Sequence, residues 1–333
     1  MNIEKYLNQL GENSVAASNK IKSLTLDEKN SLLESISKCI IEDRSEIIKA
    51  NNKDVEEAKE KLSKSMIDRL QLNDERIDGI IQSIKTVISL PDPIGNILFT
   101  NTRPNGIKVE RVSVPLGVVG IIYESRPNVT VDASILCLKS GNSVILRGGS
   151  ESFNSNLQLV KSMQRACGNI GLDKNTIQFI ETTDRSAVDY MLSKMSDYID
   201  VVVPRGGKGL VKKVQESAKI PVIGHLDGIC HIYVDESSDP ETASKIVTNA
   251  KLRRTSICGA AETVLIDEKC IDSHLPKIIN DLKSGGCEIR GDEKCKEKFN
   301  EVTLASDDDW KTEYLDAIIS IKIVNGVAAA INH

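Results

Sequence analysis

From Pro115 onward, the sequence alternates between short, continuously apolar runs and longer segments of helical length. The first series of runs comprises GVVGII (117–122), SVIL (143–146), TIQFI (176–180) and DVVV (200–203). The second comprises HIYV (231–234), TVLI (263–266), CEI (287–289) and AIISIKIV (317–324). Strands that are apolar along their whole length and separated by helices are typical of parallel sheets with both faces covered. The pattern therefore predicts two α/β domains.

The residues before Pro115 follow other patterns. The N-terminal part is highly charged and helical, and Thr25 followed by Glu28 predicts a capping box at a helix start. After the prolines of LPDPIG (90–95), the stretch NGIKVERVSV (105–114) intersperses apolar and polar residues, which indicates an extended strand in a hairpin arm. We expect this arm to pair with another subunit.

We expect the first domain to span residues 1–228, including the N-terminal helices, and the second to span 229–333. The last residues, GVAAAINH, match the first turns of a helix without a cap or a glycine stop after them. We therefore expect the second domain to be incomplete at its C-terminus, so that the chain is either a fragment or a shortened form.

Composition excludes several classes of function. The chain has 43 Lys+Arg against 48 Asp+Glu, and this net charge of −5 argues against a general nucleic-acid or membrane-surface binder. The polar N-terminus and the lack of a long apolar stretch lead us to expect a cytoplasmic protein. The eight cysteines form no C-x-x-C pair, so we expect reduced thiols and no metal site.

Three loops are candidates for ligand binding because each follows a predicted strand and precedes a predicted helix. They are YESRPN (123–128), RGGSE (147–151) and PRGGKG (204–209). Paired glycines beside a positive side chain at a helix N-terminus suit a phosphate, although such glycines can also serve only a tight turn. Two such loops in one sheet favour a nucleotide. The G-x-G-x-x-G and P-loop fingerprints are absent.

Cys258 is the candidate nucleophile. It follows Arg253 and Arg254 in NAKLRRTSICGAAETVL (249–265), among small residues that leave room for a substrate. Nearby positive charge favours the reactive thiolate, whereas a buried cysteine is only a small core residue. The residues around Cys258 leave both interpretations open.

Four segments resemble the gamma-glutamyl phosphate reductase family of the aldehyde dehydrogenase superfamily, in order across almost the whole chain. They are VPLGVVGIIYESRPNVTVDASILCLKSGNSVILRGGSESFNSN (114–156), DVVVPRGGKGL (200–210), PVIGHLDGICHIYVD (221–235) and 249–265. The resemblance implies an aldehyde dehydrogenase-like α/β fold with two doubly wound domains, an N-terminal helical segment and a β-hairpin oligomerisation arm. The first domain would bind NADP and the second would be catalytic.

The resemblance also implies a reaction. NADPH would reduce L-glutamyl 5-phosphate to L-glutamate 5-semialdehyde and phosphate through a thioacyl intermediate on Cys258, the second step of proline biosynthesis from glutamate. Ser125 would help to stabilise the oxyanion. Relatives that oxidise aldehydes carry Glu-Leu-Gly-Gly where this chain has HLDG (225–228). The absence of that water-activating glutamate fits a reductase, although His225 could serve only to form hydrogen bonds.

Further residues are assigned by the same resemblance. The cofactor NADP(H) would contact Tyr123, Glu124, Arg147, Gly148, Gly149, Ser150, Arg205, Gly206, Gly207, Gly209, Leu226 and Glu313. Arg147 and Ser150 favour NADP because a guanidinium attracts the 2′-phosphate that a carboxylate would repel. The substrate would contact Arg126, Asn128, His225, Arg253 and Arg254. Glutamate kinase is a candidate partner, and the full-length form is expected to be a homo-oligomer.

Two alternatives remain open at this point. The chain could be a related NAD(P)-dependent enzyme that acts on another acyl phosphate or aldehyde. It could also be an inactive, truncated protein that only binds a nucleotide.

Overall fold

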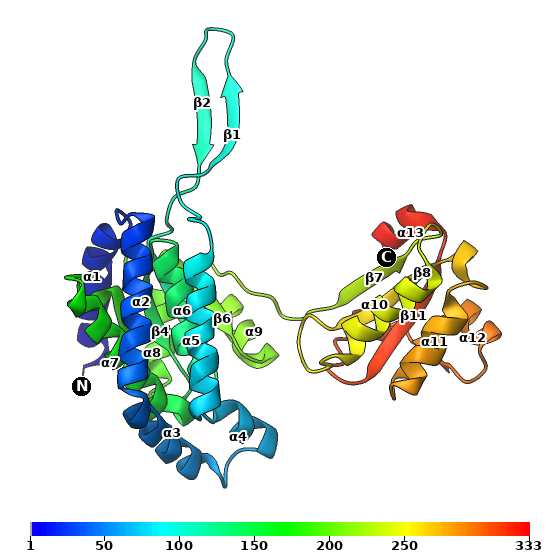
Figure 1. The fold of residues 1–333 in the computed structure, drawn as a ribbon, viewed down its shortest axis with the longest axis horizontal. Coiled ribbons are helices and arrows are strands. Elements are labelled where there is room, and N and C mark those ends of the chain that lie inside the picture. The colour runs from blue at the N-terminus through cyan, green and yellow to red at the C-terminus, as the bar shows by residue number, and fades with distance from the viewer. Residues whose placement is uncertain (1) are drawn as a thin grey trace. The chain divides into compact units, whose positions relative to one another are not determined.

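The computed structural model describes residues 2–333, and they form two compact units (Figure 1). The first unit ends at Gly224 and the second comprises His225–His333. The division expected after Gly228 therefore lies four residues into the second unit (228 against 224). Among the described residues, no helix has both the length and the apolar character needed to cross a bilayer.

The first unit begins with a layer of helices. These are α1 (Ile3–Ile21), α2 (Leu26–Glu42), α3 (Arg44–Ala58), α4 (Lys64–Leu70) and α5 (Asp74–Ser89). The predicted capping box opens α2: Thr25 Oγ1 accepts a hydrogen bond from the Glu28 N–H at 3.3 Å, and Glu28 Oε2 accepts one from the Thr25 N–H at 2.7 Å. Both bonds satisfy amides that the first turn of a helix leaves free, so this prediction is confirmed.

A hairpin follows the helices. Strand β1 (Ile97–Thr102) pairs antiparallel with β2 (Lys108–Val112), and the two form a sheet of their own that projects from the rest of the unit (Figure 1). Every residue of β2 is exposed. The predicted hairpin is confirmed, and its pairing with another subunit stays a prediction.

The remaining elements of the first unit build a four-stranded parallel sheet of order β5-β4-β3-β6. They are β3 (Val118–Tyr123), α6 (Pro127–Lys139), β4 (Ser143–Arg147), α7 (Phe153–Asn169), β5 (Ile177–Phe179), α8 (Ser186–Lys194), β6 (Val201–Arg205) and α9 (Lys208–Ser217). A short 3-10 helix, Ser150–Ser152, precedes α7 and another, Lys174–Thr176, precedes β5. All four predicted strands of this series are present.

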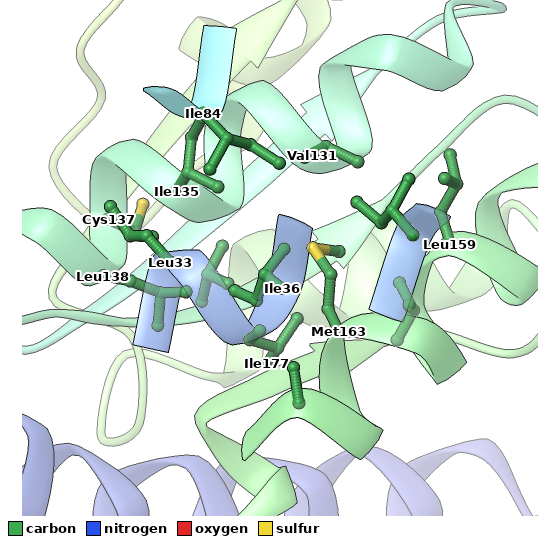
Figure 2. Packing of buried hydrophobic residues seen from close by; sticks show 14 of the residues in the cluster. Leu33, Ile36, Ile84, Val131, Ile135, Cys137, Leu138, Leu159, Met163 and Ile177 are labelled. Carbon is green, nitrogen blue, oxygen red and sulfur yellow. The ribbon is translucent and has the colours of Figure 1, made fainter. Parts of the chain in front are cut away.

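Both faces of this sheet are buried, because alternate residues of β3 enter different cores. Val119 and Ile121 belong to a cluster with α2, α5, α6 and α7, part of which Figure 2 shows around Leu33, Ile36 and Ile84. Val118 and Ile122 belong to a second cluster with α1 and α8. The sheet is therefore doubly wound, as the continuous apolar strands predicted.

The second unit contains a five-stranded parallel sheet of order β10-β9-β11-β8-β7. Its elements are β7 (Cys230–Val234), α10 (Pro240–Leu252), β8 (Ala261–Asp267), α11 (Leu275–Ser284), β9 (Glu288–Gly291), α12 (Glu293–Lys298), β10 (Thr303–Leu304), β11 (Ile318–Val324) and α13 (Gly326–Asn332). Short 3-10 helices lie at Glu268–Cys270 and Asp309–Lys311. The sequence patterns missed the two-residue β10 and the hairpin strand β1.

Candidate functional site

The three predicted ligand loops meet at one edge of the first sheet. They follow β3, β4 and β6, which are parallel neighbours, so their carboxyl ends share an edge. The Ser125 hydroxyl donates to Glu151 Oε2 at 3.0 Å, which joins the first loop to the second. The Gly207 N–H donates to Glu124 Oε2 at 2.9 Å, which joins the first to the third. The structure thus brings together the three loops that the sequence singled out.

Arg147 is the charged group buried at this edge. Its residue is 8% exposed, its guanidinium donates to the carbonyl oxygens of Gly148 and Thr183, and its Nε is buried without a hydrogen-bond partner among the described residues. Burial lowers the pKa of Arg147 from its ordinary value, against the effect of nearby Glu151 and Tyr123. A buried donor without an acceptor is costly, so this site favours an anionic ligand.

The glycines of these loops differ in the room around them. A Cβ on Gly148 would lie 2.2 Å from Asn156 Nδ2, and one on Gly206 would lie 2.6 Å from Glu124 Cδ. At Gly209, nothing lies within 4 Å. Gly148 is therefore required for packing, whereas a side chain at Gly206 would force the exposed Glu124 side chain to move. Gly209 leaves open space for a ligand.

The other predicted residues of the first unit are placed as follows. Glu124, Asn128, Ser150, Arg205 and Gly207 are exposed; Arg126, Gly149 and Gly206 are half-buried; Ser125 and Tyr123 are buried. The Tyr123 hydroxyl forms a 2.7 Å hydrogen bond with Thr130, and burial raises its pKa. The Tyr123 side chain is therefore part of the core beneath the loops.

Cys258 lies in the turn between α10 and β8, and it is exposed. Of the other seven cysteines, six are buried and Cys230 is intermediate. Burial raises the pKa of several of these thiols, to about 12 for Cys137. The exposure of Cys258 excludes the interpretation as a buried core residue and leaves the thiol accessible for chemistry.

The Cys258 turn packs against the segment before β7. A Cβ on Gly228 would lie 2.4 Å from the Cys258 carbonyl oxygen, and the Cys230 thiol donates to the same oxygen at 3.4 Å. Gly228, the last residue of the HLDG motif, therefore allows the two segments to approach closely. Exposed His225 and Leu226 precede it, and exposed Arg253 and Arg254 follow α10.

A buried ion pair holds both ends of the Cys258 turn. Lys251 Nζ, at the end of α10, lies 2.5 Å from Glu262 Oε2 in β8, and both side chains are almost fully buried. Glu262 Oε1 also accepts a hydrogen bond from the Leu315 N–H at 3.4 Å, two residues beyond half-buried Glu313. Burial raises the pKa of Glu262, and Lys251 opposes this rise. The pair thus links the Cys258 turn to the Glu313 segment.

This ion pair was not predicted from the sequence. Glu262 lies inside the otherwise apolar run that forms β8, and a charge in a buried strand was the available signal. Among the residues that the structure describes, no group of three or more His, Cys, Asp or Glu side chains could hold a metal ion.

Comparisons with known proteins show which family the chain resembles. Residues 5–296 match the aldehyde dehydrogenase family. The gamma-glutamyl phosphate reductase of Brucella suis biovar 1 is 46% identical over 332 residues, 99% of this chain and 79% of the relative. That of Bartonella tribocorum is 49% identical over 325 residues, 97% of this chain and 79% of the relative.

Solved structures give the same relationship. The crystal structure of gamma-glutamyl phosphate reductase from Thermotoga maritima is 44% identical, with a TM-score of 0.90 over 98% of this chain and 79% of that one. An acetylating aldehyde dehydrogenase from Geobacillus thermoglucosidasius shares the fold at 18% identity, with a TM-score of 0.61 over 98% of this chain and 77% of that one. The chain therefore belongs to the gamma-glutamyl phosphate reductase family of oxidoreductases, within the aldehyde dehydrogenase family.

Proposed function

We propose that the protein reduces L-glutamyl 5-phosphate to L-glutamate 5-semialdehyde with NADPH, in proline biosynthesis. The observation that carries this proposal is Cys258, an exposed thiol in a turn fixed by a buried ion pair, in a chain of this family. Covalent catalysis by cysteine needs an accessible thiolate in a defined position, and both conditions point to Cys258.

In this mechanism the Cys258 thiolate attacks the acyl carbon of the substrate. The carbon–sulfur bond forms, the bond to the phosphate oxygen breaks, and phosphate leaves with that electron pair. When bound, NADPH supplies a hydride to the acyl carbon. The resulting oxyanion re-forms the carbonyl, expels the thiolate and releases the aldehyde. The Cys258 N–H is a candidate donor to the oxyanion. Ser125 remains our candidate for a second donor, and its hydroxyl would have to leave Glu151 Oε2 to serve in this role.

The cofactor phosphates suit the loops of the first sheet. Arg147, with its unpaired buried Nε, favours the 2′-phosphate of NADP. Exposed Ser150 adds no carboxylate of its own, and the carboxylate near Arg147 is that of Glu151. Gly149 and Gly209 lie on the same loops, next to exposed Arg205. A phosphate at the Gly207 amide would have to displace the Glu124 carboxylate that accepts its hydrogen bond. Leu226 and Glu313 are our candidates to contact the nicotinamide half of the cofactor.

The HLDG motif supports reduction over hydrolysis. Exposed His225 stands where oxidising relatives carry the glutamate that activates water. A carboxylate that could activate water is absent from this position, and this favours reduction of the thioacyl group by hydride over its hydrolysis. Exposed Arg253 and Arg254 are candidates to bind the acyl phosphate because guanidinium groups pair with phosphate oxygens.

The hairpin and the chemistry of the substrate suggest partners. We propose that the exposed β1–β2 hairpin pairs with another subunit in a homo-oligomer. Acyl phosphates hydrolyse readily, so direct transfer from glutamate kinase in the cytoplasm would protect the substrate. Co-elution of the two proteins at the size of a complex would support this transfer.

The proposed function is tested through the reverse reaction. The protein is incubated with glutamate 5-semialdehyde, phosphate and NADP, and NADPH formation is followed by absorbance. Turnover should depend on phosphate and fall by about 1,000-fold or more in Cys258→Ala, because no acyl enzyme can form. Cys230→Ala, a thiol beside the same turn, is the matched control and should keep its activity. Equal losses in both variants, or turnover without phosphate, would contradict the mechanism.

A further inference from the structure

Two cysteines of the second unit lie close together at the Cys258 turn, and neither is buried. Cys258 is exposed and Cys230 is intermediate, whereas the other six cysteines are buried. An oxidant attacks a thiol that it can reach, and a disulfide needs a second thiol nearby. Cys258 and Cys230 are therefore the pair of thiols in this chain that suits an oxidation reaction.

Two contacts bring the backbones of these cysteines together. The Cys230 thiol donates a hydrogen bond to the Cys258 carbonyl oxygen at 3.4 Å. Two residues before Cys230, a Cβ on Gly228 would lie 3.1 Å from Cys258 Cβ, so the Cys258 side chain begins on the side of the turn that faces this segment. The Cys258 sulfur is one bond beyond that Cβ, and rotation about the Cα–Cβ bond of an exposed side chain moves it toward the Cys230 sulfur.

The place of Cys230 in the fold allows the small movement that a bond between the sulfurs requires. Cys230 is the first residue of β7 and pairs with Ala261, three residues after Cys258, and the strand register shifts between Cys230 and His231. A disulfide holds two Cα atoms about 4.4–6.8 Å apart. A residue at the end of a strand adjusts to such a distance more easily than one inside a regular ladder.

We infer that Cys230 is a resolving thiol that forms a reversible disulfide with Cys258 when a peroxide oxidises Cys258. The Cys258 thiolate attacks one peroxide oxygen, a sulfur–oxygen bond forms, the oxygen–oxygen bond breaks and hydroxide leaves. The sulfur is thereby oxidised to a sulfenic acid. The Cys230 sulfur then attacks it, the disulfide forms, the sulfur–oxygen bond breaks, and the leaving hydroxide takes the Cys230 proton as water. A dithiol, itself oxidised to a disulfide, restores both thiols.

The disulfide would inactivate Cys258 and protect it at the same time. A sulfur in a disulfide is no nucleophile toward an acyl group, so no acyl enzyme can form. It also escapes further oxidation to the sulfinic and sulfonic acids, which thiols do not reverse. The inference goes beyond the proposed function, because it concerns residues of the second unit alone and requires neither substrate nor cofactor.

Peptide mapping tests the bond directly. The reduced protein is freed of reductant and treated with hydrogen peroxide, the remaining thiols are blocked with iodoacetamide, and the chain is digested with trypsin. The tryptic peptides 220–245 and 255–269 each contain a single cysteine, Cys230 and Cys258, so a disulfide between the two peptides identifies the bond. We expect this joined species in the wild type, two hydrogen atoms lighter than the two reduced peptides together, and its disappearance with dithiothreitol.

Cys230→Ser is the matched variant, because its hydroxyl keeps a donor for the Cys258 carbonyl oxygen and cannot form a disulfide. After peroxide and then dithiothreitol, iodoacetamide should label most of Cys258 in the wild type. The fraction of Cys258 left unlabelled, as sulfinic or sulfonic acid, should be several-fold larger in Cys230→Ser. Cys287→Ala, which removes a buried thiol of the same unit, should behave as the wild type. An equal rate of Cys258 alkylation before oxidation verifies that Cys230→Ser keeps the turn intact.

Three results would overturn the inference: Cys258 unmodified by peroxide, Cys258 oxidised without the joined peptides, or equal irreversible oxidation in the wild type and Cys230→Ser. A disulfide between two chains, seen as a dimer on a non-reducing gel, would also overturn it, because the proposed bond lies within one chain. Peptide mapping needs no turnover. A protein that forms the bond and does not reduce the acyl phosphate would therefore contradict the proposed function alone.

Discussion

In the first unit the candidate residues lie at the carboxyl ends of the parallel strands, whereas in the second unit they lie at the amino ends. In the first unit, Tyr123–Asn128, Arg147–Ser150 and Arg205–Gly209 follow strands, so they lie at the carboxyl edge. In the second, His225–Gly228, Cys258 and Glu313 precede β7, β8 and β11, which are neighbours in the order β11-β8-β7. The thiol therefore lies at an amino edge.

The difference decides what can stabilise negative charge at each edge. Helix N-termini face the carboxyl edge, where Arg126 and Gly207 are the N-cap residues of α6 and α9. Their partial positive charge suits cofactor phosphates. At the amino edge, α10 ends at Leu252, and a helix C-terminus carries partial negative charge. Positive charge for a thiolate must there come from side chains, and Arg253 and Arg254 are the nearest in sequence.

We expect the largest effect, a loss of stability, when the buried Lys251–Glu262 ion pair beside the Cys258 turn is broken. Lys251→Met leaves Glu262 buried without its partner, which should lower the free energy of unfolding by about 3–5 kcal/mol. Urea denaturation measures this change. The control is Lys269→Met, whose partner Glu236 is exposed and whose loss should cost less than about 1 kcal/mol. The double variant Lys251→Met/Glu262→Leu should regain much of the lost stability, because it removes the unpaired buried carboxylate. If Lys251→Met and the control Lys269→Met lowered the free energy of unfolding equally, the stabilising role of the ion pair would be contradicted.

The next effect comes from displacing the thiol turn without breaking the fold. Gly228→Ala places a methyl group against the Cys258 carbonyl oxygen, so the turn must shift. We expect kcat/KM to fall by about 100-fold, the cost of misplacing a reacting group by about 1 Å. Gly168→Ala in α7, with nothing within 4 Å and no part in the proposed site, is the matched control. Normal turnover in Gly228→Ala would show that the turn tolerates the shift.

At the carboxyl edge, Arg147 should set the choice of cofactor. Arg147→Gln removes the guanidinium and keeps much of its volume, so KM for NADP should rise by about 30-fold while KM for NAD changes less than about threefold. Steady-state assays with both cofactors give the ratio. A parallel rise for NAD would assign Arg147 to a structural role instead.

The smallest effect concerns the exposed arginines of the amino edge. Arg254→Ala should slow alkylation of Cys258 by iodoacetamide at pH 7 by about two- to fivefold, because exposed charges interact weakly in water. The effect should shrink as salt is raised. Lys269→Ala, after the carboxyl end of β8, is the control and should leave the rate unchanged. A rate unaffected by Arg254→Ala would mean that other groups stabilise the thiolate.

Sequence patterns predicted the elements whose signals are local. The apolar runs mark β3 to β9 and β11, and Thr25 with Glu28 marks the start of α2. The exposure of Cys258 was not predictable, because a cysteine between arginines and an apolar strand suits a core as well as a surface. The Lys251–Glu262 pair was missed because its role depends on burial and on a partner that only the folded chain brings close.

The exposure of the β1–β2 hairpin should be visible in the rate at which its amide hydrogens exchange. Its two strands pair only with each other among the described residues, and its side chains face solvent. An isolated two-stranded ribbon is marginally stable in water, so its amides should exchange with deuterium far faster than those of β3, buried on both faces. We predict that a further strand or surface covering the hairpin would slow this exchange, so the exchange rate of its amides would reveal whether the chain assembles through it.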